Sequence, residues 1–192
     1  MTASTTAQSN HTAAKTQLTR TQRIARSALL VALLIVSCFF TIPIGPVSFT
    51  LQTGVVILIA LLCSPLEAAA VCGIYVLMGT VGLPVFSGMS GGLIRTSTGY
   101  LIGFIVGSGC AAALRVGLRK LKVPAVAADI CTAVVYMLIA DLLGGTWYAL
   151  YGGVGLAASF AGVVLPFIPV DCVKAVLAII VAAAVRKALR WD

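Results

Sequence analysis

The chain has 192 residues, of which 60% are hydrophobic and 9% are charged. Soluble domains carry about 25% charged residues, so this composition excludes a soluble domain and indicates a protein with several membrane spans. The net charge of +8 does not indicate a nucleic-acid partner, because all but two of the 13 Lys and Arg residues lie in three clusters beside apolar segments. These clusters, residues 15–26, 115–122 and 186–190, have the pattern of cytoplasmic flanks beside a lipid bilayer.

Six cysteines occur singly in or beside apolar segments, without a C-x-x-C pair. They are Cys38, Cys63, Cys72, Cys110, Cys131 and Cys172. We expect them to be small buried apolar side chains that form neither a disulfide framework nor a metal site. The histidine, His11, lies in a polar N-terminal segment and is not expected to be a ligand. The sequence therefore predicts no metal and no cofactor.

Residues 1–25 have too few apolar side chains to fold, and they are predicted to be a disordered cytoplasmic tail. Residues 26–188 are predicted to form one membrane domain with six spans, and residues 189–192 a cytoplasmic end. The expected spans are residues 26–42, 49–63, 66–79, 99–115, 123–143 and 167–185. The second and third are shorter than the ~20 residues that a straight crossing needs, so we expect them to borrow flanking residues or to be partly re-entrant.

The connections between these spans contain the turn-forming residues Gly and Pro. A turn at Pro43–Pro46 follows the first span, a connection over residues 80–98 carries Arg95, and another connection is expected over residues 144–165. The fourth span has a stripe of glycines at four-residue spacing, which allows another helix to approach closely. The stripe consists of Gly99, Gly103 and Gly107. We expect it to serve helix packing.

The three basic clusters determine the topology if all of them are cytoplasmic. Four spans must then lie between the first and second clusters and two between the second and third, which agrees with the apolar segments present. We therefore predict an all-α membrane protein with six transmembrane helices and cytoplasmic N and C termini. The Arg95 connection, residues 50–52 and Asp171 would lie near the outer side, where a pocket open to the outside can form.

Asp171 and Lys174 lie at the start of the last span, in a segment that is otherwise apolar. A charge inside a span costs roughly 2.5–3.5 kcal/mol on insertion scales, so it indicates a functional site. Because Pro169 suits the first turn of a helix, both side chains are expected on one face of the opening turns. Either they form an ion pair between helices, or Asp171 accepts hydrogen bonds from a polar solute while Lys174 attracts its anion or orients the carboxylate.

Enzymatic chemistry is not predicted. The segment Gly88-Met-Ser-Gly91 matches the G-x-S-G pattern of rhomboid intramembrane proteases, but that activity needs a histidine base beside the serine. His11 is the histidine of the chain, and it lies in the predicted tail. No Gly-Lys-Ser/Thr sequence for a Walker A loop occurs either, so ATP-driven work would need partner proteins.

Four motifs in order resemble the BioY family, the biotin-specific S components of energy-coupling factor transporters. They are Pro46-Val-Ser-Phe-Thr-Leu-Gln52, Tyr75-Val-Leu-Met-Gly-Thr-Val-Gly-Leu-Pro-Val-Phe86, Gly99-Tyr-Leu-Ile-Gly-Phe104 and Phe167-Ile-Pro-Val-Asp-Cys-Val-Lys174. The resemblance covers about residues 26–188. It implies a six-span protein in a bacterial plasma membrane that captures biotin from outside and catalyses no reaction. Transport would depend on a membrane coupling protein and two cytoplasmic ATPases.

The resemblance also implies roles for individual residues. Asp171 and Lys174 match the Asp-x-x-Lys motif that lies at the biotin site in the family. Gln52 and Tyr100 stand in matching motifs and are expected in the pocket walls.

The resemblance also predicts a partner surface and shows one departure. Ala28 and Ala32 match the small-residue pattern by which the first helices of S components meet the coupling protein. The family often reads Gly-Pro-Thr-Gly-Gly-Tyr where this chain has Arg95-Thr-Ser-Thr-Gly-Tyr100, so the aim of Arg95 is left open.

The chemistry of biotin agrees with the charged residues. Biotin has a ureido group with two N–H donors and one carbonyl, an apolar ring system and chain, and a carboxylate. A carboxylate acceptor, a cation and a mostly apolar cleft are the complementary set. We expect Asp171 at the ureido N–H groups and either Arg95 or Lys174 at the biotin carboxylate.

Two alternatives remain open. The chain could be a proton-coupled secondary transporter that uses Asp129, Asp141 and Asp171. It could also be an S component for another small vitamin.

Overall fold

The computed structural model describes residues 19–42, 48–92 and 94–189 of the chain. The turn predicted at Pro43–Pro46, most of the predicted tail with His11, and the last three residues lie outside the described residues. The helices are α1 (Arg20–Ser37), α2 (Gln52–Leu62), α3 (Pro65–Thr80), α4 (Thr98–Lys120), α5 (Ala125–Gly152), α6 (Leu156–Val163) and α7 (Ile168–Leu189). Two short strands, β1 (Thr41–Ile42) and β2 (Phe49–Thr50), pair antiparallel with Thr41 opposite Thr50.

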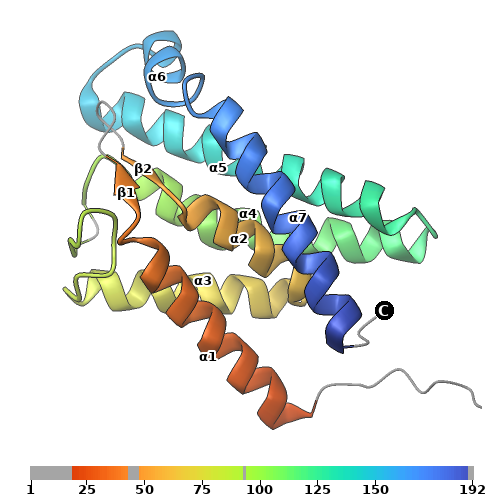
Figure 1. The fold of residues 1–192 in the computed structure, drawn as a ribbon. Coiled ribbons are helices and arrows are strands. Elements are labelled where there is room, and N and C mark those ends of the chain that lie inside the picture. Colours follow the sequence, from red (N-terminus) through yellow and green to blue (C-terminus); the bar gives the residue numbers. More distant parts are fainter. Residues whose placement is uncertain (1–18, 43–47, 93, 190–192) are drawn as a thin grey trace, which may run out of the picture.

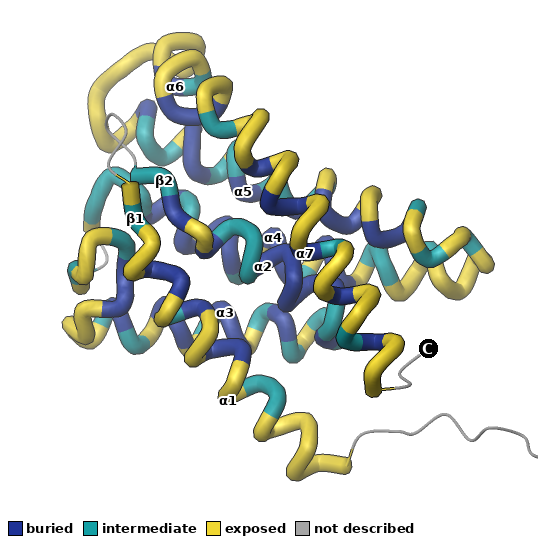
Figure 2. Tube along the Cα trace, viewed as in Figure 1, coloured by how far each residue is buried: buried dark blue, intermediate teal, exposed yellow. Residues whose placement is uncertain are grey.

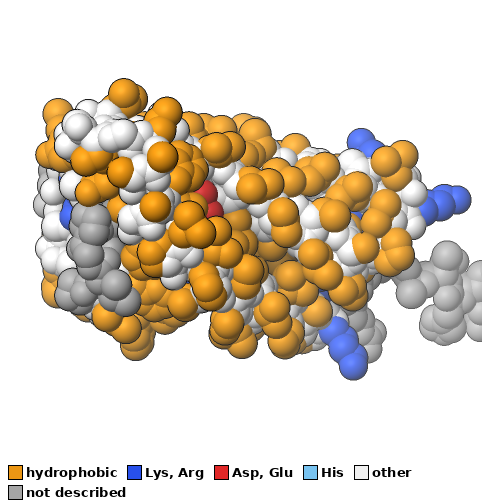
Figure 3. Space-filling model, turned by 90° about the horizontal axis from the view of Figure 1, so that it is seen from above, with side chains coloured by type: hydrophobic (Ala, Val, Ile, Leu, Met, Phe, Trp, Pro, Cys, Tyr) orange, Lys and Arg blue, Asp and Glu red, His pale blue; other side chains and the backbone are white. Residues whose placement is uncertain are grey.

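The helices form a bundle with two different ends (Figure 1). One end carries β1, β2, α6 and the connection between α3 and α4. The opposite end carries the start of α1, the turn between α4 and α5, and the end of α7. The described parts of the three basic clusters therefore share one end, as the topology argument requires. In a space-filling view most of the visible Lys and Arg side chains gather at that end, and hydrophobic side chains cover the middle (Figure 3).

Capping residues determine where two of the helices begin. The side chain of Thr19 accepts a hydrogen bond from Gln22 N at 3.3 Å, and Thr19 N donates to Gln22 Oε1 at 2.9 Å. This capping box starts α1 at Arg20, six residues before the expected span, although no apolar periodicity marks that start. In the same way Ser64 N donates to Glu67 Oε2 at 3.1 Å at the start of α3.

The end of α5 differs from the sequence prediction. A connection was expected from residue 144, but α5 continues through Gly152 and ends where Gly153 adopts a left-handed φ of 62°. Gly144 and Gly145, at the start of the expected connection, are helical. Glycine is needed at both positions because aromatic rings from other segments pack where a side chain would lie. A Cβ on Gly144 would lie 2.4 Å from the ring of Tyr100, and one on Gly145 would lie 3.1 Å from the ring of Phe160. The remainder of the expected connection contains α6, which the sequence did not predict.

The glycine stripe of α4 packs against α5. A Cβ on Gly99 would lie 2.3 Å from Trp147 Cβ, and one on Gly103 would lie 2.9 Å from Ala140 Cα. Backbone contact of this kind leaves no room for a side chain. The prediction that the stripe serves helix packing is confirmed.

The surface and the core are both apolar, as in a membrane protein. Three helices of the described part, α4, α5 and α7, are long and apolar enough to cross a bilayer, while α2 and α3 are shorter apolar helices. The buried face of each helix points into the bundle, and the exposed faces outside it remain largely hydrophobic (Figure 2, Figure 3). Such a surface suits lipid, because apolar side chains are favourable in the hydrocarbon interior of a bilayer. The predicted all-α membrane architecture is confirmed at this level.

The prediction that the cysteines are buried is confirmed for only some of them. Cys38, Cys63 and Cys72 are buried, as expected. The thiols of α4, α5 and α7 were expected to be buried but are exposed on the outer faces of their helices; they are Cys110, Cys131 and Cys172. A small apolar side chain is tolerated there because the outer face of a membrane helix meets lipid.

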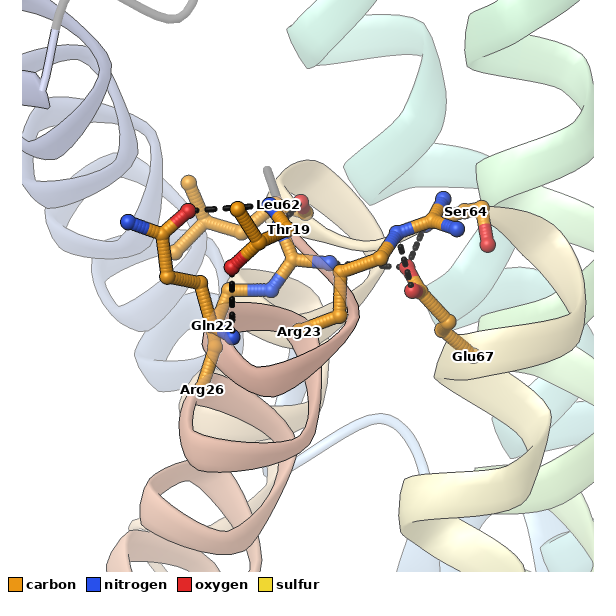
Figure 4. Close-up of polar contacts among 7 residues, drawn as sticks. All are labelled: Thr19, Gln22, Arg23, Arg26, Leu62, Ser64 and Glu67. Carbon is orange, nitrogen blue, oxygen red and sulfur yellow. Dashed lines mark hydrogen bonds and ion pairs between the residues drawn. The ribbon is translucent and has the colours of Figure 1, made fainter. Parts of the chain in front are cut away.

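Ion pairs tie the helices together at the basic end. Glu67 on α3 pairs with Arg23 Nε at 3.0 Å and with Arg26 Nη2 at 2.7 Å, and Arg26 also donates to the carbonyl of Leu62 at 3.0 Å (Figure 4). These contacts hold the first turns of α1 against the turn between α2 and α3.

A second ionic cluster is buried between α4, α5 and α7. Asp129, only 1% exposed, accepts from Arg115 Nε at 2.7 Å and from Arg186 Nη2. Arg186 also donates to the carbonyl of Leu61 at 3.4 Å. This cluster connects the end of α7 to α4 and α5 and, through the carbonyl of Leu61, to the end of α2.

Candidate functional site

A pocket lies at the end of the bundle that carries β2 and α6. Its empty volume is about 620 Å³, part of it in the opening to solvent. It is lined by Ser48, Phe49, Thr50, Gln52, Thr53, Phe86, Ser87, Ser97, Tyr100, Leu101, Phe104, Asp141, Val163, Phe167, Asp171 and Lys174. The wall combines apolar and aromatic side chains with polar and charged ones, which suits a small molecule that has both kinds of surface.

Asp171 and Lys174 lie on one face of the first turns of α7, as predicted. Lys174 Nζ donates to Asp171 Oδ1 at 2.8 Å and to the carbonyl of Thr50 at 2.6 Å, and it lies 3.9 Å from the centre of the Phe49 ring. Within the described residues Asp171 Oδ2 accepts no hydrogen bond. The pair is therefore both an ion pair and part of the pocket wall, so the two interpretations made from the sequence are compatible.

Gln52 lies at the start of α2, and its amide is held in place from two sides. Its Nε2 donates to the Tyr75 hydroxyl, and its Oε1 accepts from Thr50 Oγ1 at 3.3 Å. Tyr75 in turn donates to the carbonyl of Val85 at 2.8 Å. Gln52 lines the pocket as expected, and this chain of hydrogen bonds fixes its orientation.

Aromatic rings form much of the remaining wall. Phe49 and Phe167 stack with ring centres 6.5 Å apart and planes 11° apart, so they join β2 to the start of α7. Tyr100 also lines the pocket, while its hydroxyl donates to the carbonyl of Val163 at 2.9 Å. Because that hydroxyl is used to hold the end of α6, Tyr100 offers the pocket chiefly its ring.

Arg95 lies beside the pocket, behind its lining residues. Its guanidinium donates to Ser90 Oγ and, at 3.5 Å, to the carbonyl of Ser87, and it lies 5.8 Å from the centre of the Phe86 ring. Its backbone carbonyl accepts from Trp147 Nε1 at 2.9 Å, which anchors the residue to α5. Ser87 and Phe86 line the pocket, so Arg95 is one residue away from it in this structure.

Asp141 also lines the pocket, although the sequence suggested it only for the proton-coupled alternative and not as a ligand-binding residue. It lies on α5 and is half-buried. The sequence contains a signal for this role, because Asp141, like Asp171, is a carboxylate within a span, and a charge there is costly. The stacked Phe49 and Phe167 were also missed as wall residues, although both lie inside motifs that carried the family resemblance.

Ala28 and Ala32 lie on α1, outside the pocket lining. Both are exposed, whereas Leu30, Val31 and Leu34 of the same helix are buried in the core. The small-residue pair therefore faces away from the bundle.

The family model for BioY matches residues 8–191. The chain belongs to the BioY family. It is 35% identical over 166 residues to the probable biotin transporter BioY of Pyrococcus horikoshii, an alignment that covers 85% of this chain and 95% of the relative. It is 32% identical over 169 residues to the biotin transporter BioY of Thermotoga maritima, with 86% and 96% coverage.

The fold of the chain also matches a solved structure. The crystal structure of the S-component for biotin from an ECF-type ABC transporter superposes with a TM-score of 0.81. Its sequence is 26% identical, and the match covers 89% of this chain and 95% of that chain. The chain therefore shares the fold of that S-component.

Proposed function

We propose that this chain is the biotin-binding S component of an energy-coupling factor transporter. It takes up biotin from the outer side of the cell membrane and catalyses no reaction. The observation that carries the proposal is the Asp171–Lys174 pair in the wall of a pocket that also has aromatic surface, in a chain of the BioY family. Its close relatives are described as biotin transporters.

The pocket has the groups that biotin needs. Asp171 keeps one oxygen free of hydrogen bonds within the described residues and is suited to accept from the ureido N–H groups. Phe49, Phe167 and Tyr100 supply apolar surface for the ring system and chain. Gln52 has a fixed amide beside them. We assign the biotin carboxylate to the side of the pocket near Arg95, because the ammonium of Lys174 already has three partners.

The membrane orientation is part of the proposal. Helices α1, α2, α3, α4, α5 and α7 correspond to the six expected spans, and α6 lies in the connection before the last of them. With the basic end in the cytoplasm, both termini are cytoplasmic and the pocket lies near the outer side. The exposed Ala28 and Ala32 then offer α1 to a coupling protein within the bilayer. The chain has no Walker A sequence, so the energy comes from partner proteins, for which the family resemblance implies two cytoplasmic ATPases.

Binding of labelled biotin by the purified chain in detergent is the test. Unlabelled biotin and desthiobiotin should displace the label, whereas riboflavin and thiamine should not. Binding of riboflavin or thiamine in place of biotin would instead identify an S component for another vitamin. In cells that also express the coupling protein and ATPases, uptake should stop when ATP is depleted and persist when the proton gradient is collapsed.

Asp171→Asn tests the site itself. The substitution should weaken biotin binding by about 1.5–3 kcal/mol, the range for a hydrogen bond to a charged group. Glu67→Gln is the matched control, because it also removes a carboxylate from an ion pair but lies at the opposite end of the bundle. Unchanged binding with reduced thermal stability in Asp171→Asn would reduce the pair to a structural role.

A further inference from the structure

We propose that Asp141 is a second ligand-recognising carboxylate of the pocket, one that accepts a hydrogen bond from a ureido N–H of biotin. This inference rests on the proposed function, because it assigns a specificity-determining residue to the same site. The carboxylates within the last three spans differ in whether they have an ionic partner.

The other two carboxylates of the last three spans have cationic partners. Asp129 pairs with Arg115 and Arg186, and Asp171 pairs with Lys174. The side chain of Asp141, on the same helix as Asp129, has no ion pair and no hydrogen bond within the described residues. The described part of the protein therefore provides no donor for this carboxylate, and any partner has to come from the pocket, as water or as a ligand. A ligand that displaces the water must replace its hydrogen bonds, because an unpaired carboxylate away from water is costly.

The nearby cation is not available to Asp141. Lys174 has its ammonium directed to Asp171, to the carbonyl of Thr50 and to the face of the Phe49 ring. An ammonium has three N–H donors, so these contacts use its capacity. Asp141 is thus left as a half-buried acceptor that lines the pocket. An acceptor in this position suits a ligand that brings its own N–H donors.

The two carboxylates can share the two donors of one ureido group. Asp171 lies on α7 and Asp141 on α5, and both line the same pocket. A ureido group carries one N–H on each of its two nitrogens, so one carboxylate can accept from each. A site built to hydrogen-bond polar groups discriminates strongly against analogues that lack them, because its own groups are then left unpaired. Asp141 would therefore contribute selectivity for the intact ureido ring.

The test compares biotin with 2-iminobiotin in Asp141→Asn. The cyclic guanidine of 2-iminobiotin is cationic at neutral pH, so its N–H groups gain from a carboxylate more than those of neutral biotin do. We expect Asp141→Asn to weaken biotin by about ten-fold or more, and 2-iminobiotin by roughly a further ten-fold. Asp141→Glu, which keeps the charge, should retain part of the preference for 2-iminobiotin. Leu142→Ala, an exposed neighbour on α5, is the control and should change neither affinity.

Each alternative result has a distinct meaning. Equal losses for both ligands in Asp141→Asn would show that Asp141 shapes the pocket without accepting from the ring, and no loss for either would remove it from the site; both results overturn the inference. The wild-type chain and Asp171→Asn are measured in parallel. If the wild-type chain binds biotin, and Asp171→Asn weakens that binding but Asp141→Asn does not, this inference is refuted and the proposed function stays intact. Absence of biotin binding by the wild-type chain would refute the proposed function itself.

Discussion

Replacing Asp129 by Leu should destabilise the protein strongly, although Asp129 is far from the pocket. The carboxylate is 1% exposed and compensates two guanidinium groups. Arg186 is 7% exposed, so water cannot replace the lost carboxylate, and it keeps only the 3.4 Å contact to the carbonyl of Leu61. The side chain of Arg115 is 18% exposed and can be solvated more easily. Removing one partner of a buried pair costs about 3–5 kcal/mol, and we assign most of that to Arg186.

The measurement is the free energy of unfolding of the purified protein in micelles, from a reversible titration with sodium dodecyl sulfate. Asp141→Leu is a matched control, because it makes the same change on the same helix. Within the described residues Asp141 has no ion pair that the substitution could break. Asp141→Leu should leave the free energy of unfolding unchanged or raise it. The double variant Asp129→Leu/Arg186→Met should recover part of the loss, since it removes both buried charges. An Asp129→Leu protein as stable as the wild type, or single-variant losses that simply add in the double variant, would refute the argument.

Two further predictions concern the partner surface and the loop beside the pocket. Ala28→Trp with Ala32→Trp should abolish co-purification with the coupling protein while biotin affinity stays at the wild-type value, because both alanines are exposed on α1. A complex that still forms would disprove that assignment. Arg95→Ala should weaken biotin by about ten-fold more than biotin amide in equilibrium binding, since only the acid offers a charge partner. Equal losses would mean that Arg95 holds the Ser87 and Ser90 segment without acting on the carboxylate.

Asp171 and Lys174 could be predicted from the sequence because the free-energy cost of a charge within a span depends on the span itself and not on the tertiary structure. Asp171 and Lys174 were identified without any tertiary information, and the structure brings both to the pocket. The same argument could have assigned Asp141. It could not have paired Asp129 with Arg186, because the basic residues near the ends of spans were attributed to solvent-facing flanks. Their burial follows only from the crossing of α5 and α7.

Elements without a periodic pattern were predicted least well. β1 and β2 have two residues each, which is too short for an alternating signal. The continuation of α5 through Gly144 was missed because glycine favours turns in isolation, whereas here it accommodates the ring of Tyr100. In both cases the deciding contact comes from a segment distant in the sequence.

The close packing of α4 on α5 also restricts how this pocket could be redesigned. A Cβ on Gly144 would fall 2.4 Å from the ring of Tyr100, so this wall can neither gain a side chain nor move outward without separating the two helices. Another part of the wall is joined by the stacking of Phe49 on Phe167, a contact between side chains. Variants made to accept a bulkier or smaller analogue should therefore begin at those two phenylalanines, where volume can change while the backbone stays in place.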